Sequence, residues 1–201
     1  MSVEAEKSRL RKIFKEKRVA LKNDEVAKKS QAINQNFIKN LLPKIYQKNS
    51  KKIFSLYLQS GNEVGTGALA DYFQNNRIAF SYPKISSKNI LDFIAAEGDQ
   101  WFVPNDLYGS VLEPASGKKV LPDFLIVPLL AFDRDLARLG MGGGFFDRTI
   151  NYFEKINHKI ITIGFAYDSQ RSVELLPLEK TDRKLDFIVT EKNVLVPSPV
   201  S

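Results

Sequence analysis

The residue types best suited to chemistry in this chain gather in one short run, from Arg138 to Arg148. Glycine lets backbone N–H groups approach a ligand without a side chain in the way, and the start of a helix adds partial positive charge and free donors. Arginines neutralise phosphate oxygens, and an aspartate such as Asp147 can hold a magnesium ion against a phosphate chain. The run therefore predicts a phosphate-binding loop. Its glycines are Gly140, Gly142, Gly143 and Gly144.

The spacing of these glycines differs from that of two familiar phosphate-binding motifs. No Gly-Lys-Ser/Thr follows, so the run is not a Walker A loop. Phe145 stands where the dinucleotide-binding fingerprint has its third glycine. The alternative interpretation is a flexible turn in which Asp147 caps a helix. The position of the run, between an apolar strand and a helix, favours phosphate binding.

A second group of candidates lies near the N-terminus, where lysines and arginines are dense. Lys7, Arg11 and Arg18 are spaced i, i+4 and i+11, so they share one face of a helix. This face could contact an anionic ligand or simply be solvated, and charge spacing by itself favours the solvated face. The net charge of +7 favours anionic partners in general, from nucleic acid and membrane surfaces to nucleotides and polycarboxylates.

The composition restricts the chemistry further. The chain has no cysteine and one histidine, His158, which excludes disulfides, a thiolate nucleophile and a cysteine- or histidine-rich metal site. Any metal must be held mainly by oxygen, as magnesium is. No apolar segment approaches the length of a membrane span, and the charged N-terminus lacks the apolar core of a signal peptide. We therefore expect a cytoplasmic protein with no membrane partner.

The elements that position these residues follow from hydrophobic spacing. The helical period predicts an N-terminal pair of helices at about 3–41, a helix from an N-cap at Thr66 through Phe73, and a helix at about 145–156. Residues 97–120 and 133–144 are expected to be irregular. Apolar runs predict strands at 53–58, 78–82, 91–95, 124–132, 159–165 and 187–190.

Strands alternate with helices in this assignment, and several strands are apolar on both faces. This pattern is typical of a mostly parallel sheet covered on both sides, so we predict a Rossmann-like, three-layer α/β fold. No internal repeat or domain boundary is evident in the sequence. Residues 1–201 are expected to form a single domain that includes the N-terminal helical pair, and a chain of this length can bury a sizeable core.

The loop that contains Asp147 resembles the signature of the 5-formyltetrahydrofolate cyclo-ligase family. That signature is an Arg-Leu-Gly-x-Gly-x-Gly-Tyr-Tyr-Asp-like run after a strand ending in Phe-Asp. Here Phe145-Phe146 replace the tyrosine pair, and Thr181 stands where the family usually has a histidine. From Lys7 to Thr190, further segments resemble the family in the same order: Lys7-x-x-Leu10-Arg11, Leu58 to Val64, Tyr82-Pro83-Lys84, Tyr108-Gly109, Gly164 to Tyr167, and Asp182 with Leu185-Asp186.

The resemblance implies a ligase that converts 5-formyltetrahydrofolate and ATP into 5,10-methenyltetrahydrofolate, ADP and phosphate, through a phosphorylated formyl group. It implies Mg²⁺ as cofactor, ATP as co-substrate and a reduced folate as the second substrate. Arg138 and Asp147 would be catalytic, and Asp147 and Asp186 would coordinate the metal. The folate would contact Leu58, Glu63 and Tyr108. ATP would contact Lys7, Arg11, Gly140, Met141, Gly142, Gly143, Gly144, Phe145 and Phe146. A monomer is the default expectation.

Two other functions stay open at this stage. The basic N-terminal face fits a nucleic-acid-binding protein, although the sequence has no RNA- or DNA-binding motif and its aromatic residues are not interleaved with the basic cluster. The glycine-rich loop fits another ATP- or phosphosugar-using enzyme of the same architecture. Leu58, Glu63 and Tyr108 are the residues that would separate such an enzyme from a folate enzyme. The ligase interpretation expects small-molecule substrates and no nucleic acid.

Overall fold

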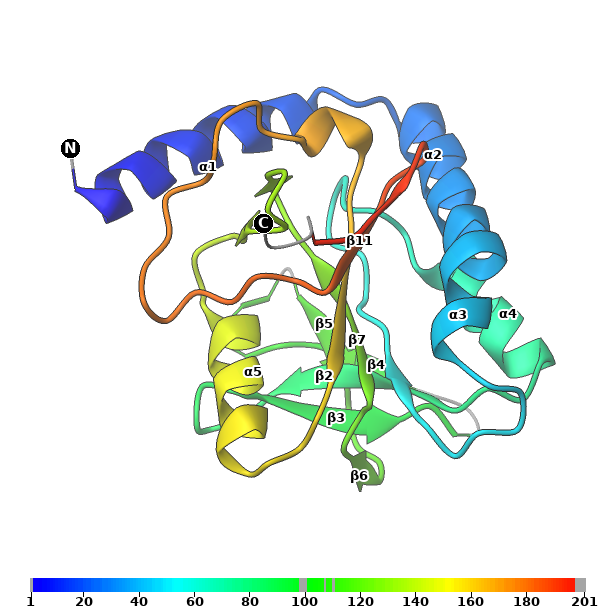
Figure 1. The fold of residues 1–201 in the computed structure, drawn as a ribbon. Helices are drawn as coiled ribbons and strands as arrows, with labels where there is room; N and C mark the ends of the chain where they lie inside the picture. Colours follow the sequence, from blue (N-terminus) through cyan, green and yellow to red (C-terminus); the bar gives the residue numbers. More distant parts are fainter. Residues whose placement is uncertain (1, 98–100, 107, 110, 198–201) are drawn as a thin grey trace.

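The centre of the molecule is a mixed sheet with helices on both sides, as the computed structural model shows (Figure 1). The structure describes residues 2–97, 101–106, 108–109 and 111–197. Within these residues the sheet has eight strands in the order β12-β11-β10-β7-β1-β2-β3-β6. The five from β11 to β2 run parallel, whereas β12, β3 and β6 are antiparallel to their neighbours. The predicted three-layer, mostly parallel α/β fold is confirmed.

The elements are mostly short. The strands of the sheet are β1 Phe54–Ser55, β2 Phe80–Ile85, β3 Leu91–Ala95, β6 Lys119–Val120, β7 Phe124–Pro128, β10 Ile161–Phe165, β11 Phe187–Val189 and β12 Val194–Leu195. Two small ribbons pair β4 Phe102–Pro104 with β5 Leu112–Pro114, and β8 Ala131–Phe132 with β9 Arg138–Leu139. The helices are α1 Val3–Val19, α2 Asn23–Asn36, α3 Leu42–Ile45, α4 Gly67–Asn75 and α5 Phe145–Lys155, with a π-helical turn at Phe37–Leu41. None of the helices in the described residues is long and apolar enough to cross a membrane.

The two faces of the sheet bury different residues because side chains alternate along a strand. In β7, Phe124 and Ile126 pack in the cluster that contains residues of α2, α3 and α4. Leu125 and Val127 point the other way, into the cluster that contains residues of α5. Each of these four side chains is at most 1% exposed. Figure 1 shows α5 on one side of the sheet and α2 to α4 on the other.

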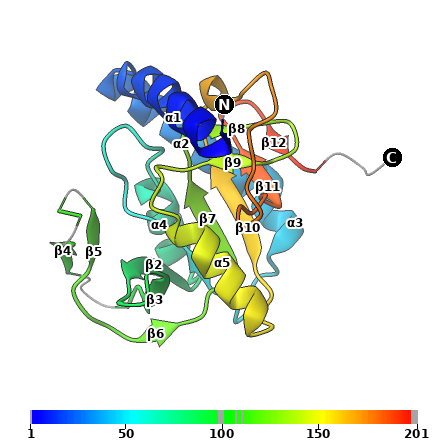
Figure 2. The same cartoon turned by 90° about the vertical axis from the view of Figure 1, so that its left-hand side faces the viewer.

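Helix α1 belongs to neither layer. Phe14 of α1 packs with Leu130, Ala131 and Leu139, in and beside the β8–β9 ribbon that follows β7. Figure 2 shows α1 above the carboxyl ends of β7 and β10. The basic face of α1 therefore lies at the end of the sheet where open α/β folds bind ligands.

Several predicted elements are confirmed, among them the N-terminal helical pair, the strand at 91–95 and helix α5. The strand predicted at 124–132 is wrong in its second half. Pro128 has no N–H to continue a ladder, and the Leu130 N–H donates instead to Leu139 O at 2.7 Å. The chain leaves the sheet there as the β8–β9 ribbon, so residues 133–144 are not wholly irregular.

For other predicted elements the structure shows different first or last residues. The strand predicted at 78–82 corresponds to β2, which begins at Phe80 and continues past Pro83 to Ile85. The strand tolerates Pro83 because β1 pairs only with Phe80 and Ser81, so no partner in β1 requires an N–H from residue 83. The strand predicted at 53–58 shortens to β1. Thr66 is the N-cap residue of α4, as predicted, but its side chain makes no capping hydrogen bond, because the hydroxyl donates to Tyr57 O at 2.6 Å. The stretch 97–120 contains β4, β5 and β6, and its residues 98–100, 107 and 110 lie outside the described residues.

Candidate active site

A cleft of about 1510 Å³ lies at the carboxyl end of the parallel strands, the usual ligand-binding crevice of open α/β sheets. It is bounded by α1, by the segments that follow β1 and β7, by the glycine-rich loop with the first turns of α5, and by residues 179–183. All of the predicted site residues except Asp186 line this cleft: Lys7, Arg11, Leu58, Glu63, Tyr108, Arg138, Gly140, Met141, Gly142, Gly143, Gly144, Phe145, Phe146 and Asp147.

The glycine-rich loop has the backbone geometry that its sequence suggests. Gly144 is the N-cap of α5 and adopts a left-handed conformation with φ of 64°, and Gly142 has φ of 103°. The free N–H groups of the first turn of α5 are therefore next to the cleft. Arg11 approaches the loop from α1, with its Nε donating to Gly140 O at 3.3 Å. The loop and the basic helix predicted from separate parts of the sequence thus contact each other.

Replacing Gly142 with alanine is expected to raise the KM for ATP about fivefold, which corresponds to about 1 kcal/mol. A φ of 103° is strained for any L-residue, so the loop should shift, and the added Cβ would lie against Arg11 Nε at 3.5 Å, an ordinary contact distance. The measurement is the ATP KM, with thermal unfolding followed in parallel. Gly67→Ala is the control, since a Cβ there meets nothing within 4 Å. An ATP KM equal to that of the wild type would contradict the assignment of the loop.

Arg138 and Asp147 form an ion pair beside this loop. Arg138 Nη2 donates to Asp147 Oδ1 at 2.9 Å, and Arg138 Nη1 donates to Arg183 O at 2.7 Å. The Arg138 side chain is 4% exposed, and burial lowers its pKa against the opposing effect of Asp147 and Asp182. Asp147 Oδ1 also accepts from Arg183 N at 3.1 Å. Among the described residues no hydrogen bond reaches Asp147 Oδ2, which leaves that oxygen available to a ligand.

The first and last residues of the basic face of α1, Lys7 and Arg18, are buried and not solvated. Lys7 is 4% exposed and Arg18 is 7% exposed. Lys7 Nζ donates to Glu179 Oε2 at 2.7 Å and to Asp182 Oδ2 at 2.5 Å. Burial opposes the charged form of Lys7, but the bonds to these carboxylates outweigh it and raise the lysine pKa. Lys7 therefore stays protonated and joins α1 to the 179–183 segment.

Glu63 and Arg18 form a second buried ion pair in the cleft. Arg18 Nη1 lies 3.4 Å from Glu63 Oε1, and the Glu63 side chain is 12% exposed. The Ser60 N–H donates to Glu63 Oε2 at 3.1 Å. Burial raises the pKa of Glu63 above its ordinary value, although Arg18 and the Ser60 N–H act in the opposite direction. Arg18 Nη2 also lies 3.7 Å from Met141 Sδ, so the Arg18–Glu63 ion pair lies close to the glycine-rich loop.

Aromatic and apolar side chains line part of the same cleft. The Tyr108 ring meets the Phe145 ring edge to face, with the centroids 5.6 Å apart. The Arg148 guanidinium lies over the Phe145 ring at 5.0 Å. Leu58, just after β1, adds aliphatic surface. A planar ring with hydrogen-bond donors fits a site of this kind, with apolar walls and one fixed carboxylate at Glu63.

The acidic residues fit magnesium only if a ligand completes its coordination. Among the described residues, no three Asp, Glu, His or Cys side chains are grouped as a metal site. Magnesium is commonly held by one or two carboxylates together with substrate phosphates, so a complete protein cage is not required. Asp147 and Asp182 both line the cleft and both act on Arg138. These two carboxylates beside the glycine-rich loop fit the ion.

Asp186 is the one predicted site residue that the structure places elsewhere, and its assignment as a metal ligand is corrected. Asp186 Oδ2 accepts from Thr162 N at 2.7 Å and from Thr162 Oγ1 at 2.8 Å. In the sheet Thr162 pairs with Leu125, three residues before the cleft residue Pro128, or about 10 Å along the strand. Asp186 bridges β10 and β11, and of the two aspartates Asp182 is the one that lines the cleft.

Three further residues of the cleft had no assigned role in the sequence analysis. Glu179 and Asp182 contact Lys7 across 172 and 175 positions of the chain, so no local pattern could pair them. Arg18 shares the helical face of Lys7 and Arg11, which is the signal that pointed to it, but its partner Glu63 lies 45 positions away. Each of these contacts depends on how α1 packs across the sheet.

Comparison with known proteins agrees with this arrangement. The sequence model of the 5-formyltetrahydrofolate cyclo-ligase family matches residues 3–191. A 5-formyltetrahydrofolate cyclo-ligase of Haemophilus influenzae is 35% identical over 163 residues, covering 77% of this chain and 84% of the relative. That of Mycoplasma pneumoniae is 31% identical over 191 residues, covering 93% and 99%. The NMR structure of the Aquifex aeolicus 5,10-methenyltetrahydrofolate synthetase matches with a TM-score of 0.77 and 31% identity, covering 94% of this chain and 92% of that one.

The family match spans the α1 face, the Glu63 segment, the glycine-rich loop and Asp182, so it covers every part of the cleft described above. The chain belongs to the 5-formyltetrahydrofolate cyclo-ligase family.

Proposed function

We propose that this protein catalyses the ATP- and magnesium-dependent cyclisation of 5-formyltetrahydrofolate to 5,10-methenyltetrahydrofolate. The observation that carries the proposal is the shared cleft. A phosphate-binding loop at the start of α5, the Arg138–Asp147 pair and the buried Glu63 carboxylate all line one cavity. A two-substrate reaction between a nucleotide and a flat heterocycle needs these parts together.

The proposed chemistry has two steps. The γ-phosphoryl group of ATP passes to the formyl oxygen on N5, which makes the formyl carbon a good electrophile and leaves ADP. N10 then attacks that carbon, the C–O bond breaks, phosphate departs with the oxygen, and the N10 proton is lost. No protein nucleophile is needed, which agrees with a chain that has no cysteine. The protein contributes positioning and charge stabilisation.

Each part of the cleft has a role in this scheme. The loop N–H groups and Arg11 hold the phosphate chain, and Lys7 adds positive charge to the same region. Arg138 stabilises negative charge on the transferring phosphoryl group, and its bond to Arg183 O fixes its position. Asp147 and Asp182 would hold the magnesium ion, which supplies charge neutralisation for the phosphates. Glu63 accepts hydrogen bonds from the donor edge of the pterin, while Leu58 and Tyr108 pack on the ring.

The test is a near-ultraviolet absorbance time course of the purified protein with 5-formyltetrahydrofolate, ATP and magnesium. We expect the methenyl chromophore to grow only in the complete mixture, with one phosphate released per turnover. Omission of ATP or of magnesium should give no signal, because each is needed for phosphoryl transfer. A flat trace from folded protein in the complete mixture would refute the proposed reaction.

The nucleic-acid alternative loses its main support from the structure. Lys7 and Arg18 are buried and paired with carboxylates, so they are not part of an exposed basic surface. A dissociation constant for random oligonucleotides that stays below about 1 μM at physiological salt would revive that alternative. An enzyme that uses ATP on a phosphosugar is distinguished by the same absorbance assay, since it would give no folate product.

A further inference from the structure

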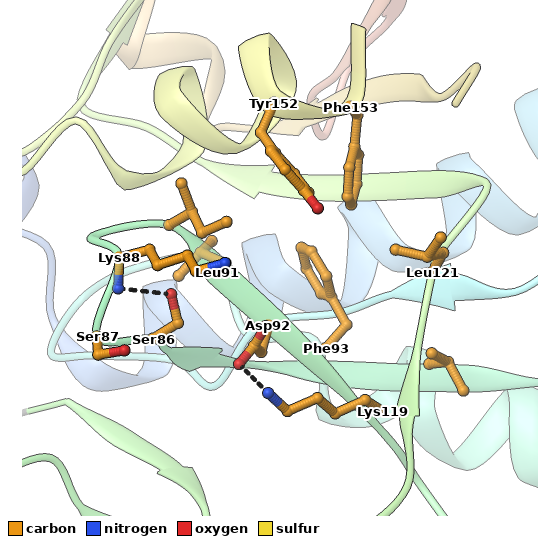
Figure 3. Close-up of a pocket in the computed structure, with 12 residues that line it drawn as sticks. Ser86, Ser87, Lys88, Leu91, Asp92, Phe93, Lys119, Leu121, Tyr152 and Phe153 are labelled. Atoms are coloured by element: carbon orange, nitrogen blue, oxygen red, sulfur yellow. Dashed lines mark hydrogen bonds and ion pairs between the residues drawn. The ribbon is translucent and has the colours of Figure 1, made fainter. Parts of the chain in front are cut away.

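A side pocket of about 310 Å³ opens beside the cleft, between the β2–β3 hairpin and α5. Figure 3 shows Tyr152 and Phe153 of α5 facing Leu91, Asp92 and Phe93 of β3, with Lys88 and Lys119 at the margins. The pocket and the cleft share four lining residues: Lys88, Ile90, Leu91 and Tyr152. The two cavities are therefore neighbours, and Lys88 lies at the border between them.

A chain of contacts connects the pocket to the ring-binding part of the cleft. Tyr108 meets Phe145, and Arg148 lies over Phe145. Arg148 Nε then donates to Asn89 O at 2.6 Å, which anchors the hairpin turn that carries Lys88. The turn that carries Lys88 is thus joined through Arg148 and Phe145 to Tyr108, at the ring-binding part of the cleft.

The pocket offers one cation that is not neutralised. Lys119 Nζ pairs with Asp92 Oδ2 at 2.6 Å. Among the described residues, no carboxylate pairs with Lys88. Arg148 lines the cleft and not the pocket, and its side chain donates to the backbone oxygens of Asn89 and Gly143. The remaining surface combines hydroxyls of Ser86 and Ser87 with apolar Leu91 and Phe153. Such a lining suits a carboxylate on a short aliphatic stem.

We infer that this side pocket receives the glutamate end of the folate, with Lys88 pairing with a carboxylate of that glutamate. The inference rests on the proposed function, in which the pterin ring lies at Glu63 and Leu58. It assigns a substrate subsite to the 86–93 hairpin, which is separate from the residues that contact the reacting atoms. Lys88 therefore acts on folate binding and leaves the phosphoryl transfer unchanged.

The experiment compares two ligands and three proteins. The ligands are 5-formyltetrahydrofolate and 5-formyltetrahydropteroate, which lacks the glutamate. The proteins are the wild type, Lys88→Gln, and Lys118→Gln as the matched control. Lys118 is exposed and lines neither cavity. Dissociation constants are measured by titration calorimetry, alongside kcat, the folate KM and the ATP KM.

We expect Lys88→Gln to weaken binding of 5-formyltetrahydrofolate about fivefold, the size of a favourable partly exposed ion pair. The truncated ligand should bind Lys88→Gln and wild type equally, and Lys118→Gln should match the wild type throughout. Unchanged affinity of Lys88→Gln for the full substrate would overturn the inference, as would an equal loss with the truncated ligand or a raised ATP KM. If the wild type binds folate without turning it over, the proposed reaction fails while the dissociation constants still decide the subsite.

Discussion

Asp147→Asn is expected to lower kcat about 100- to 1,000-fold, the scale of removing one preorganised electrostatic contact from an active site. Asparagine keeps an acceptor for Arg138 Nη2 and the Arg183 N–H, but it loses the negative charge that would hold magnesium against the phosphates. The KM for the folate should change little, because Glu63 and Leu58, the residues proposed to contact the pterin, make no contact with Asp147. The absorbance assay at saturating ATP measures the effect.

Asparagine is a better probe here than alanine because Asp147 is hydrogen-bonded to the buried Arg138. The Arg138 side chain is 4% exposed, and among the described residues Asp147 is the one carboxylate that forms an ion pair with it, while Asp182 acts from farther away. Removing one member of a buried pair leaves an uncompensated charge, which costs about 3–5 kcal/mol. Both substitutions remove the negative charge, but asparagine keeps the acceptor for Arg138 Nη2 and the Arg183 N–H, whereas alanine removes these hydrogen bonds as well and should lose more stability.

The matched control is Asp135→Asn, which removes the same charge from a nearby loop. Asp135 is 38% exposed in its side chain and pairs only loosely with Lys184 and Arg134, at 3.6 Å and 4.0 Å. This variant should keep wild-type kcat. Activity of Asp147→Asn within a factor of two of the wild type, with both variants folded by circular dichroism, would remove Asp147 from the site.

The sequence predicted those parts of the site whose conformation depends on residues that are neighbours in the chain. The glycines from Gly140 to Gly144 and the start of α5 are fixed by local backbone preferences, and their geometry follows from the sequence. The bounds of β3 likewise follow from its own apolar pattern. The choice between Asp182 and Asp186 does not, because both are aspartates of one extended segment and only the pairing of β10 with β11 decides which faces the cleft.

The architecture of the fold was predictable from the sequence, but one of its small ribbons was not. Alternating apolar runs and helical periods are enough to indicate a mostly parallel sheet between helices. The ribbon formed by β8 and β9 was missed because its pairing joins Leu130 to Leu139 across a turn, and an unbroken apolar run looks like one strand. This ribbon carries Arg138 and supports Phe14 of α1, so an error in strand length conceals how the basic helix reaches the cleft.

Helix α1 connects the two proposed substrate sites. Lys7 and Arg11 lie on the nucleotide side, next to Asp182 and Gly140. Arg18, three helical turns later, contacts Glu63 on the folate side. Because one rigid helix carries all three, movement of α1 toward bound phosphate would also move Arg18 against Glu63. This geometry explains why a cleft built from distant segments needs the N-terminal helix as an integral part.

Glu63→Gln is expected to raise the folate KM about 10- to 100-fold while the ATP KM stays within a factor of two. A buried carboxylate that accepts hydrogen bonds from a ligand contributes about 1.5–3 kcal/mol, and an amide cannot accept from two adjacent N–H donors. Glutamine also leaves Arg18 without its carboxylate, so unfolding must be followed in parallel. Glu174→Gln, at an exposed position, is the control and should behave as wild type.

The pH dependence of the folate KM gives a second test of Glu63. Only the ionised carboxylate accepts bonds from the pterin donors, so the wild-type KM should rise as the pH falls through the Glu63 pKa. Burial raises that pKa, and Arg18 limits the rise, so the loss should begin at a higher pH than for an exposed glutamate. In Glu63→Gln this acidic limb should be absent. An unchanged KM and an unchanged pH profile would remove Glu63 from the folate site, and the pterin would then have to bind through neutral groups such as the Ser60 backbone.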